Sequence, residues 1–261
     1  MKIKFQKYQG TGNDFIIIDN TDLSFPSENY SLIKRLCDRK YGIGCDGLIL
    51  IEPSKSSDFT MNYYNSDGNL GSMCGNGARC SVKFVQNLKI INDNTVFTAY
   101  DGLHDASILD NIITLSMKPV RNIKSIGDDL LLDTGSPHYV KIVQCLNDYK
   151  VFENGKKIRN NSLFKKNGVN VNFVEQISEN EFSVRTYERG VEDETLSCGT
   201  GVTAVALAMF KLGKTNSKEV VIKTKGGELS VKFDTIEERY FDIKLSGGVE
   251  KIKYINTNFV I

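Results

Sequence analysis

The stretches Met73-Cys74-Gly75-Asn76-Gly77-Ala78 and Ser197-Cys198-Gly199-Thr200-Gly201-Val202 share the pattern Cys-Gly-x-Gly, and each leads into an apolar run with helical spacing. A thiol directly before a helix lies beside backbone N–H groups that have no partner within the helix. It also lies at the positive end of the helix dipole, and both features favour the thiolate. One such thiol indicates a nucleophile. Two in matching settings indicate a symmetric task performed from two sides.

The spacing of these stretches indicates an internal repeat. The two cysteines are 124 positions apart, and three further elements recur in the same order at an offset of 123. The recurring pairs are the turns 10–16 and 133–139, the strand starts Gly47 and Asn170, and the segments Tyr63-Tyr64-Asn65 and Thr186-Tyr187-Glu188. Four elements in one order at nearly one offset predict two homologous halves.

Each half is predicted to be a sheet around one helix. Helical signals cover residues 27–38, 75–88 and 200–212, and the last segment is apolar on nearly every side, which predicts a helix enclosed by protein. Asp101-Gly102 and Gly226-Gly227 lie between strand-like runs and indicate hairpins. We therefore expect an α+β fold of two homologous domains related by pseudo-twofold symmetry, each a largely antiparallel sheet wrapped around a central helix.

The domain boundary is expected near Lys118-Pro119-Val120. The first domain then comprises residues 1–119 and carries Cys74, with the tail 250–261 returning to it as an added strand. The second domain comprises residues 120–249 and carries Cys198. Because small ligands commonly bind between domains, the active site is expected in the cleft between the two.

Composition argues against several classes of function. The 33 Lys and Arg residues balance 32 Asp and Glu residues, so no net field attracts nucleic acid or a membrane surface. The most apolar stretch, 202–210, is far shorter than the roughly 20 residues that span a bilayer, and the N-terminal sequence lacks the pattern of a signal peptide. Six cysteines and two histidines without a Cys-x-x-Cys pair predict neither a disulfide framework nor a metal site. We expect a cytoplasmic protein.

Two thiols on opposite sides of one carbon can invert its configuration. One removes a proton as the base, and the other returns a proton to the opposite face as the acid. The ordinary thiol pKa of about 8.5 falls at a helix start, so a thiolate and a thiol can coexist near neutral pH. The backbone amides of Gly75-Asn76 and Gly199-Thr200 could then hold a carboxylate and the charge that develops as the α-proton leaves.

Further candidate residues lie near these two stretches. Asn13, Asn65 and Asn170 occupy repeat-equivalent turns and are interpreted as ligand contacts. His138 is a candidate for lining the site, and Glu188-Arg189 is interpreted as a clamp for a zwitterion. The remaining cysteines are expected to be small buried hydrophobes: Cys37, Cys45, Cys80 and Cys145.

The chain resembles the diaminopimelate epimerases of the cofactor-independent amino-acid racemase superfamily. The motifs that carry the resemblance are 10–15 (GTGNDF), 42–47 (GIGCDG), 65–68 (NSDG), 74–80 (CGNGARC), 187–190 (YERG) and 198–201 (CGTG), which spread over nearly the whole chain. The resemblance implies interconversion of LL- and meso-2,6-diaminoheptanedioate on the route to lysine and peptidoglycan. It implies no pyridoxal phosphate, metal or nucleotide, and a monomer or a homodimer.

The resemblance also implies roles for individual residues. Cys74 and Cys198 match the two catalytic thiols. Substrate-binding positions are matched by Asn13, Asn65, Asn170, Glu188 and Arg189, and the α-carboxylate cradle by the amides of Gly75, Asn76, Gly199 and Thr200. Groups that tune the thiols are matched by Glu188 and His138. Gly47 and Ser136 also fall at substrate-binding positions, but some members have Gln at the first and many have Asn at the second, and Gly47 can offer only its backbone.

Three alternative functions remain open from the sequence. A related racemase could act on proline, hydroxyproline or histidine. A binding module for an amino acid would need no catalysis, although binding alone gives no reason for a thiol on both faces. A redox switch could instead form a bridge between Cys74 and Cys198.

Overall fold

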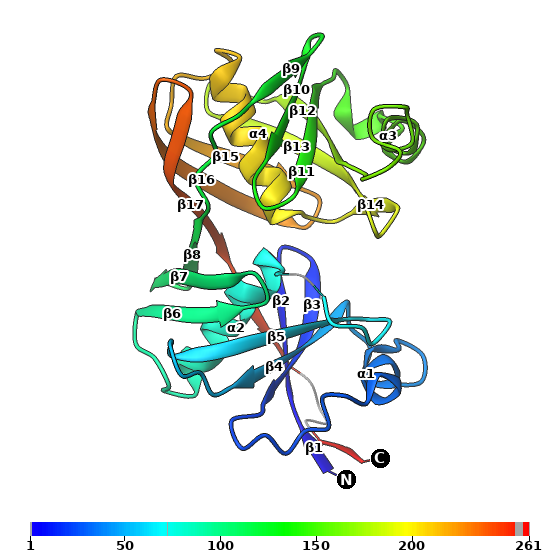
Figure 1. Ribbon diagram of the computed structural model, residues 1–261, viewed down its shortest axis with the longest axis vertical. Coiled ribbons are helices and arrows are strands. Elements are labelled where there is room, and N and C mark those ends of the chain that lie inside the picture. Colours follow the sequence, from blue (N-terminus) through cyan, green and yellow to red (C-terminus); the bar gives the residue numbers. More distant parts are fainter. Residues whose placement is uncertain (1, 72, 254–257, 261) are drawn as a thin grey trace. The chain divides into compact units, whose positions relative to one another are not determined.

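The computed structural model describes residues 2–71, 73–253 and 258–260 of the chain (Figure 1). The chain divides into two compact units. The first unit extends to Leu115 and resumes at Gly247, and the second unit is Ser116–Ser246. No helix among the described residues is long and apolar enough to span a membrane.

The first unit is a mixed but mainly antiparallel sheet. Its main sheet runs in the order β18, β2, β3, β4, β5, β6, β7, β8. The strands are β2 (Gln6–Gly10), β3 (Asn13–Asp19), β4 (Gly47–Glu52), β5 (Phe59–Asn65), β6 (Asn94–Ala99), β7 (Gly102–Leu109), β8 (Ile112–Met117) and β18 (Glu250–Ile252). Only the pairs β3–β4 and β5–β6 are parallel among these.

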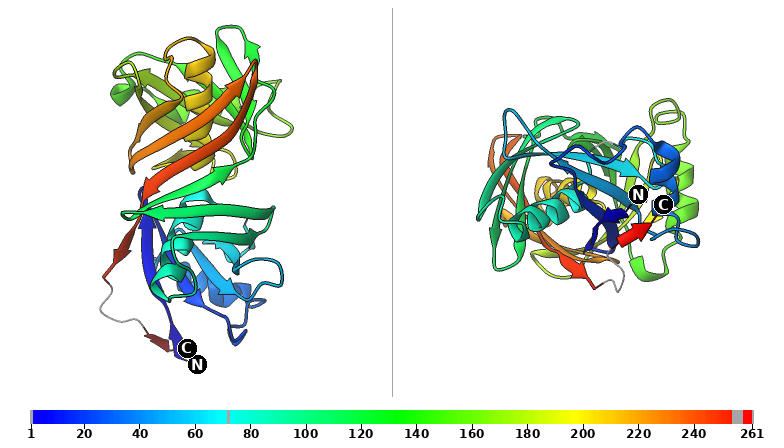
Figure 2. Two further views of the ribbon diagram at one scale, coloured as in Figure 1. Left: turned by 90° about the vertical axis from the view of Figure 1, so that its left-hand side faces the viewer. Right: turned by 90° about the horizontal axis from the view of Figure 1, so that it is seen from below.

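The C-terminal tail adds strands to the first unit. β18 pairs with β2, and β19 (Asn258–Val260) pairs with β1 (Lys2–Lys4), so both ends of the chain lie together (Figure 2). Residues 254–257 and 261 of the tail lie outside the described residues.

The second unit repeats this arrangement. Its sheet runs β9, β10, β11, β12, β13, β15, β16, β17, and β14 pairs with β13. The strands are β9 (Lys124–Ile126), β10 (Asp129–Asp133), β11 (Pro137–Ile142), β12 (Asn170–Gln176), β13 (Glu181–Glu188), β14 (Asp193–Thr195), β15 (Glu219–Thr224), β16 (Gly227–Ile236) and β17 (Arg239–Gly248). The parallel pairs β11–β12 and β13–β15 take the places of β3–β4 and β5–β6.

The strand register repeats as well. Phe15 lies opposite Gly47 in the parallel pair β3–β4. His138 lies opposite Asn170 in the parallel pair β11–β12, and both of these residues are 123 positions further along the chain. The predicted repeat is therefore a structural duplication of the main sheet, to which the second unit adds β14.

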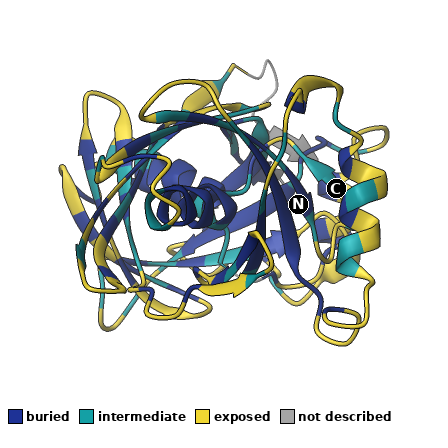
Figure 3. Cartoon of the chain, turned by 90° about the horizontal axis from the view of Figure 1, so that it is seen from above, coloured by how far each residue is buried: buried dark blue, intermediate teal, exposed yellow. Residues whose placement is uncertain are grey.

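One buried helix forms the centre of each unit, as predicted. α2 (Gly75–Asn87) and α4 (Gly199–Lys211) begin and end within one residue of the expected limits. In α4 every residue from Gly201 to Met209 is buried, because the helix is apolar all round and strands enclose it (Figure 3). Gly213, at a φ of +65°, follows its end.

The peripheral helices were harder to predict. α1 (Tyr30–Cys37) is shorter than the expected 27–38, since the Asn29 side chain accepts a hydrogen bond from the Leu32 N–H and so starts the helix there. α3 (Val151–Arg159) was not predicted.

The four cysteines outside the helix starts were all expected to be buried. Cys37, Cys45 and Cys80 are buried, but Cys145 is exposed. That expectation was wrong because Cys145 adopts a left-handed conformation at the start of the surface 3-10 turn Leu146–Asp148.

Candidate active site

Cys74 occupies the N-cap position of α2. Its backbone is extended (φ −112°, ψ 115°), its carbonyl accepts a hydrogen bond from the Ala78 N–H at 2.8 Å, and its thiol makes no capping bond. The residue is partly buried against the core of the first unit, beside Tyr63 and Met73. The first-turn amides of Gly75 and Asn76 thus follow the thiol directly at the positive end of the helix dipole.

A polar network joins two of the predicted binding residues near this helix start. The Asn76 Nδ2 group donates to Asn13 Oδ1 at 2.6 Å, and the Asn13 amide donates to Asp46 at 3.2 Å. Asn76 Oδ1 accepts hydrogen bonds from Arg79 Nη2 (2.9 Å) and Thr11 Oγ1 (3.3 Å). The turn between β2 and β3 is therefore tied to the first turn of α2.

Arg79 is a functional candidate that the sequence reasoning missed. Its side chain is fully buried, and its Nε and Nη1 groups have no hydrogen-bond partner among the described residues. Burial lowers the pKa of the guanidinium, whereas the neighbouring Cys80 and Cys74 thiols act in the opposite direction. A helical spacing of three from Asn76 was the signal that could have drawn attention to it.

The predicted positions Gly47 and Asn65 are opposite one another at the start of β4 and the end of β5. Asn65, the last residue of β5, is exposed, and its N–H donates to the Asn69 carbonyl oxygen across the turn that follows. A Cβ at Gly47 would lie 2.4 Å from Tyr63 Cε2 and 2.8 Å from the Tyr64 carbonyl oxygen. The Tyr63 ring therefore fills the space of a side chain here, and Gly47 offers only its backbone.

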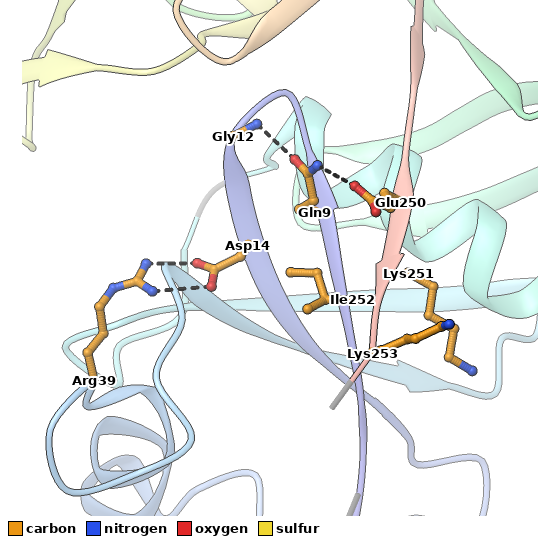
Figure 4. Close-up of a pocket in the computed structure, with 8 residues that line it drawn as sticks. All are labelled: Gln9, Gly12, Asp14, Arg39, Glu250, Lys251, Ile252 and Lys253. Carbon is orange, nitrogen blue, oxygen red and sulfur yellow. Dashed lines mark hydrogen bonds and ion pairs between the residues drawn. The ribbon is translucent and has the colours of Figure 1, made fainter. Parts of the chain in front are cut away.

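An ion-pair cluster in the first unit includes Asp46, the residue to which the Asn13 amide donates. Asp14 contacts Lys7 and Arg39, each at 2.7 Å, and Arg39 also contacts Asp46 at 2.7 Å. Burial by itself would raise the pKa of Asp14, but the hydrogen bonds and charges of Arg39 and Lys7 hold it below its ordinary value. A surface pocket beside this cluster contains none of the predicted site residues, as Figure 4 shows; its lining is Gln9, Gly12, Asp14, Arg39, Glu250, Lys251, Ile252 and Lys253.

Cys198 occupies the same position at the start of α4. Its backbone is again extended (φ −127°, ψ 110°), and its carbonyl accepts a hydrogen bond from the Val202 N–H at 2.8 Å. The Cys198 Sγ atom lies 3.4 Å from Thr200 Oγ1. Glu188, at the end of β13, accepts a hydrogen bond from Thr195 Oγ1 at 2.5 Å. Burial raises the pKa of the Glu188 carboxyl, while hydrogen bonds from Thr195 and Cys198 partly oppose this.

The second unit gathers several more predicted residues around this thiol. His138 Nε2 lies 2.9 Å from both Ser136 Oγ and Thr200 Oγ1, and Asn170 Nδ2 donates to Ser136 Oγ at 3.0 Å. Burial, reinforced by the charge of Arg189, lowers the pKa of His138 to about 3, so the imidazole is neutral near pH 7.

Arg189 is the least enclosed of the predicted residues in the second unit. Its side chain is exposed, and its Nη1 donates to the Asn167 carbonyl at 3.0 Å. Its backbone N–H donates to Asn170 Oδ1, also at 3.0 Å, so Arg189 is held to Asn170 through the main chain.

Asn172 is a second residue that the sequence reasoning missed. It is fully buried two residues after Asn170, so both point to the same side of β12. The alternation of side-chain directions along a strand could have indicated that Asn172 lies on the same face as Asn170. Among the described residues, no three His, Cys, Asp or Glu side chains are grouped as metal ligands would be.

Solved structures share the fold at low sequence identity. A PhzF-family phenazine biosynthesis protein of Bacillus anthracis has a TM-score of 0.78 at 13% identity, with full coverage of both chains. A probable proline racemase of Agrobacterium radiobacter has a TM-score of 0.70 at 16% identity, covering 96% of this chain and 91% of that one. The chain therefore has the α+β fold of the proline racemase and PhzF class, as expected from the sequence.

Sequence comparison assigns the family within this class. The chain belongs to the diaminopimelate epimerase family, whose sequence profile matches residues 5–111 and 130–252. It is 53% identical to a diaminopimelate epimerase of Flavobacterium psychrophilum over 95% of this chain and 97% of that protein. The corresponding protein of Chlorobaculum tepidum is 41% identical over 89% of this chain and 93% of its own length. The chain is therefore an isomerase, and the resemblance seen in its motifs is confirmed.

Proposed function

We propose that the chain interconverts LL- and meso-2,6-diaminoheptanedioate by proton transfer between two thiols. The observation that carries this proposal is a cysteine at the N-cap of the buried helix in each of two equivalent units. The high identity to proteins named diaminopimelate epimerase supports the substrate.

The proposed reaction balances without a further reactant. The thiolate of one cysteine takes the α-proton, and the electron pair of the C–H bond delocalises into the α-carboxylate. The thiol of the other cysteine then gives its proton to the opposite face of the carbon, which restores a C–H bond and inverts the centre. The enzyme ends with the thiol and the thiolate exchanged between Cys74 and Cys198, both of which must then face one α-carbon.

The helix starts can supply anion stabilisation during this step. We assign the α-carboxylate to the backbone amides of Gly75-Asn76 and Gly199-Thr200, because N–H groups at a helix start attract negative charge. Donors in fixed positions stabilise the charge that develops on the carboxylate in the transition state.

The far end of the substrate requires different groups. The exposed Arg189 guanidinium suits the second carboxylate, since arginine binds a carboxylate through two parallel hydrogen bonds. Asn13, Asn65, Asn170 and Glu188 supply amides and a carboxylate for the second ammonium and carboxylate groups, and Gly47 and Ser136 complete the predicted set. We further place the enzyme in the cytoplasm, in lysine and peptidoglycan precursor synthesis, as a monomer or homodimer.

The test is exchange of the α-proton in deuterated water. We expect deuterium to enter diaminopimelate when the protein is added, and neither proline nor histidine to exchange. Exchange confined to proline or histidine would overturn the substrate assignment.

Cysteine variants test the two thiols. Cys74→Ala and Cys198→Ala should fold with unchanged circular dichroism but lose epimerisation by at least about a thousandfold, because each removes an acid or base for which no substitute is at hand. Cys145→Ser is the matched control, since Cys145 is exposed and lies outside both helix starts, and it should retain activity. Turnover like that of the unaltered protein in either alanine variant contradicts the mechanism.

A further inference from the structure

A buried line of polar groups leads to Cys198 from the sheet of the second unit. Thr186 Oγ1 donates to Asn172 Oδ1 at 3.0 Å, and Asn172 Nδ2 lies 3.1 Å from His138 Nδ1. His138 Nε2 is 2.9 Å from Thr200 Oγ1, which is 3.4 Å from Cys198 Sγ. The side chains of Thr186, Asn172 and His138 are all at least 97% removed from solvent.

The orientation of the Asn172 amide is set by a group that can only accept. Asn172 Nδ2 lies 3.1 Å from the backbone carbonyl oxygen of Tyr139, which has no proton to give. The NH₂ group therefore faces Tyr139 and His138, and Oδ1 faces the Thr186 hydroxyl.

This orientation decides where the imidazole carries its proton. Because Asn172 Nδ2 donates, His138 Nδ1 must accept, and the single proton of a neutral imidazole then resides on Nε2. The ring is neutral because it is buried and because the nearby charge of Arg189 disfavours the imidazolium; the carboxylate of Glu188 is engaged by Thr195 and Cys198.

The Nε2 proton in turn directs the Thr200 hydroxyl. The single Nε2–H is shared between two hydroxyl acceptors at 2.9 Å, Ser136 and Thr200. The Asn170 NH₂ group lies farther from Nε2, at 3.4 Å, and donates to Ser136 Oγ at 3.0 Å. Once Thr200 Oγ1 accepts from the imidazole, its own proton is available to Cys198 Sγ. A donated hydrogen bond favours the thiolate over the thiol.

The equivalent positions of the first unit show that the fold does not require this line. At the repeat offset, Asn172 corresponds to Ile49, His138 to Phe15 and Thr186 to Tyr63. The strand register agrees, since Val140 lies opposite Asn172 as Ile17 lies opposite Ile49. Ile49 and Phe15 are buried core residues. A buried polar pair costs free energy where an apolar pair would pack, so its presence in only one of the two units points to a function.

We propose that Asn172 is a positioning residue for Cys198: by holding His138 as the Nε2–H tautomer, it turns the Thr200 hydroxyl toward the Cys198 sulfur as a hydrogen-bond donor. The catalytic use of this arrangement rests on the proposed function, in which Cys198 serves as a base. The arrangement involves only the tautomer of His138 and the hydrogen bond to Cys198, so it can be tested without substrate.

The tautomer is measured directly by ¹⁵N NMR of the imidazole rings in the unaltered protein. The chain has two histidines, so a His104→Gln variant assigns the signals of His138. We expect Nδ1 to be unprotonated and Nε2 to carry the proton near pH 7. An Nδ1–H tautomer or an imidazolium at this pH overturns the proposal.

Thiol reactivity tests the consequence. Peptide-resolved alkylation by iodoacetamide, followed across pH, reports Cys198 and Cys74 separately in one sample. Thr200→Val removes the donor while keeping the backbone amide, and it should slow alkylation of Cys198 about tenfold near pH 7, equal to about one pKa unit. Thr200→Ser should restore most of the rate, and alkylation of Cys74 should change less than about twofold.

Asn172→Leu keeps the volume of the side chain but removes its N–H. We expect the single Nε2–H tautomer to be lost and the Cys198 rate to fall toward that of Thr200→Val. The matched control is Thr203→Val, because Thr203 is a buried α4 threonine whose hydroxyl bonds only to the Gly199 carbonyl among the contacts recorded for the described residues. A folded Asn172→Leu protein with an unchanged tautomer and Cys198 profile overturns the proposal.

The outcomes separate this inference from the proposed function. If diaminopimelate does not exchange but the tautomer and alkylation results are as expected, the substrate assignment fails and the role of Asn172 stands. If exchange occurs but Thr200→Val alkylates at the normal rate, the role of Asn172 fails and the substrate assignment stands. Should Asn172→Leu not fold, the tautomer in the unaltered protein and the Thr200→Val rate still decide.

Discussion

At the scale of single residues, the two thiols differ more in their surroundings than their motifs suggest. Cys198 lies beside hydroxyls and a carboxyl, while Cys74 lies beside an apolar cluster and close to the buried cation of Arg79. Both settings can favour a thiolate, by hydrogen bonds in one case and by charge in the other.

Arg79→Met should make Cys74 less reactive without a comparable loss of stability. A positive charge in a buried site stabilises a neighbouring thiolate, so its removal should slow alkylation of Cys74 about tenfold near pH 7 and leave Cys198 unchanged. Stability should change little, because the desolvation cost of the buried guanidinium, whose Nε and Nη1 groups have no partner among the described residues, offsets the hydrogen bonds of Nη2 to Asn76 and Thr11. Alkylation and thermal unfolding of Arg79→Met and Arg79→Lys measure both effects. Equal Cys74 rates in the folded Met and Lys variants contradict this prediction.

The stability of the protein should depend on His138 below neutral pH. The folded pKa of about 3 lies below the unfolded value of about 6.5, so the unfolded chain binds the proton first as pH falls. Between pH 6.5 and 3 the His138 contribution is therefore lost at about 1.4 kcal/mol per pH unit. Urea unfolding of the unaltered protein and of His138→Gln at pH 7 and 5 isolates the effect, with His104→Gln as control. If the free energy of unfolding changes equally between pH 7 and 5 in all three proteins, the prediction is wrong.

Gly47→Ala should destabilise the first unit. The added Cβ would meet both the Tyr63 ring and the backbone carbonyl of Tyr64, and the backbone cannot move aside cheaply, so a loss of about 1–3 kcal/mol is expected in urea unfolding. Gly248→Ala is the matched control, since a Cβ at that strand glycine meets no heavy atom nearer than 4.0 Å. Equal stability of the two variants argues against the close packing of Tyr63.

At the scale of helices and strands, the central helices were predictable and α3 was not. α2 and α4 have strong local sequence signals, since each begins with closely spaced glycines and continues as a long apolar run. α3 contains Gly155 and is mostly polar, so its local signal is weak. It forms because it packs on β12 and β13, where the Tyr187 side chain takes the space beside Gly155.

Gly155→Ala tests this packing by the sign of its effect. In an exposed helix the change would stabilise by about 1 kcal/mol. Here the Cβ would lie 2.4 Å from Tyr187 Cβ, so we expect the melting temperature to fall. The nearby Lys157→Ala, at an exposed position of the same helix, should not lower the melting temperature by a similar amount. A higher melting temperature for Gly155→Ala would show that α3 is not closely packed against β13 at this position.

At the scale of the whole molecule, one supersecondary plan is used twice with different chemistry inside. The strand order, the parallel pairs and the helix starts recur, yet the positions of Phe15 and Ile49 in the first unit hold His138 and Asn172 in the second. The duplication keeps a thiol at each helix start, while the groups that surround the two thiols have diverged. Such divergence suits a substrate with one reacting carbon and a far end that needs its own contacts.

The duplication, the two helix-start cysteines and the family can all be recognised from the amino-acid sequence alone. These features are local: a turn glycine, a helical period and a fixed offset can be read without knowing what packs against them. Three other relations appear only in the folded protein: Tyr63 fills the space at Gly47, Arg79 is buried, and Asn172 is connected through His138 to Cys198. Those relations join residues far apart in the chain, and they arise because pairing of strands and burial bring side chains into contact whatever their distance in sequence.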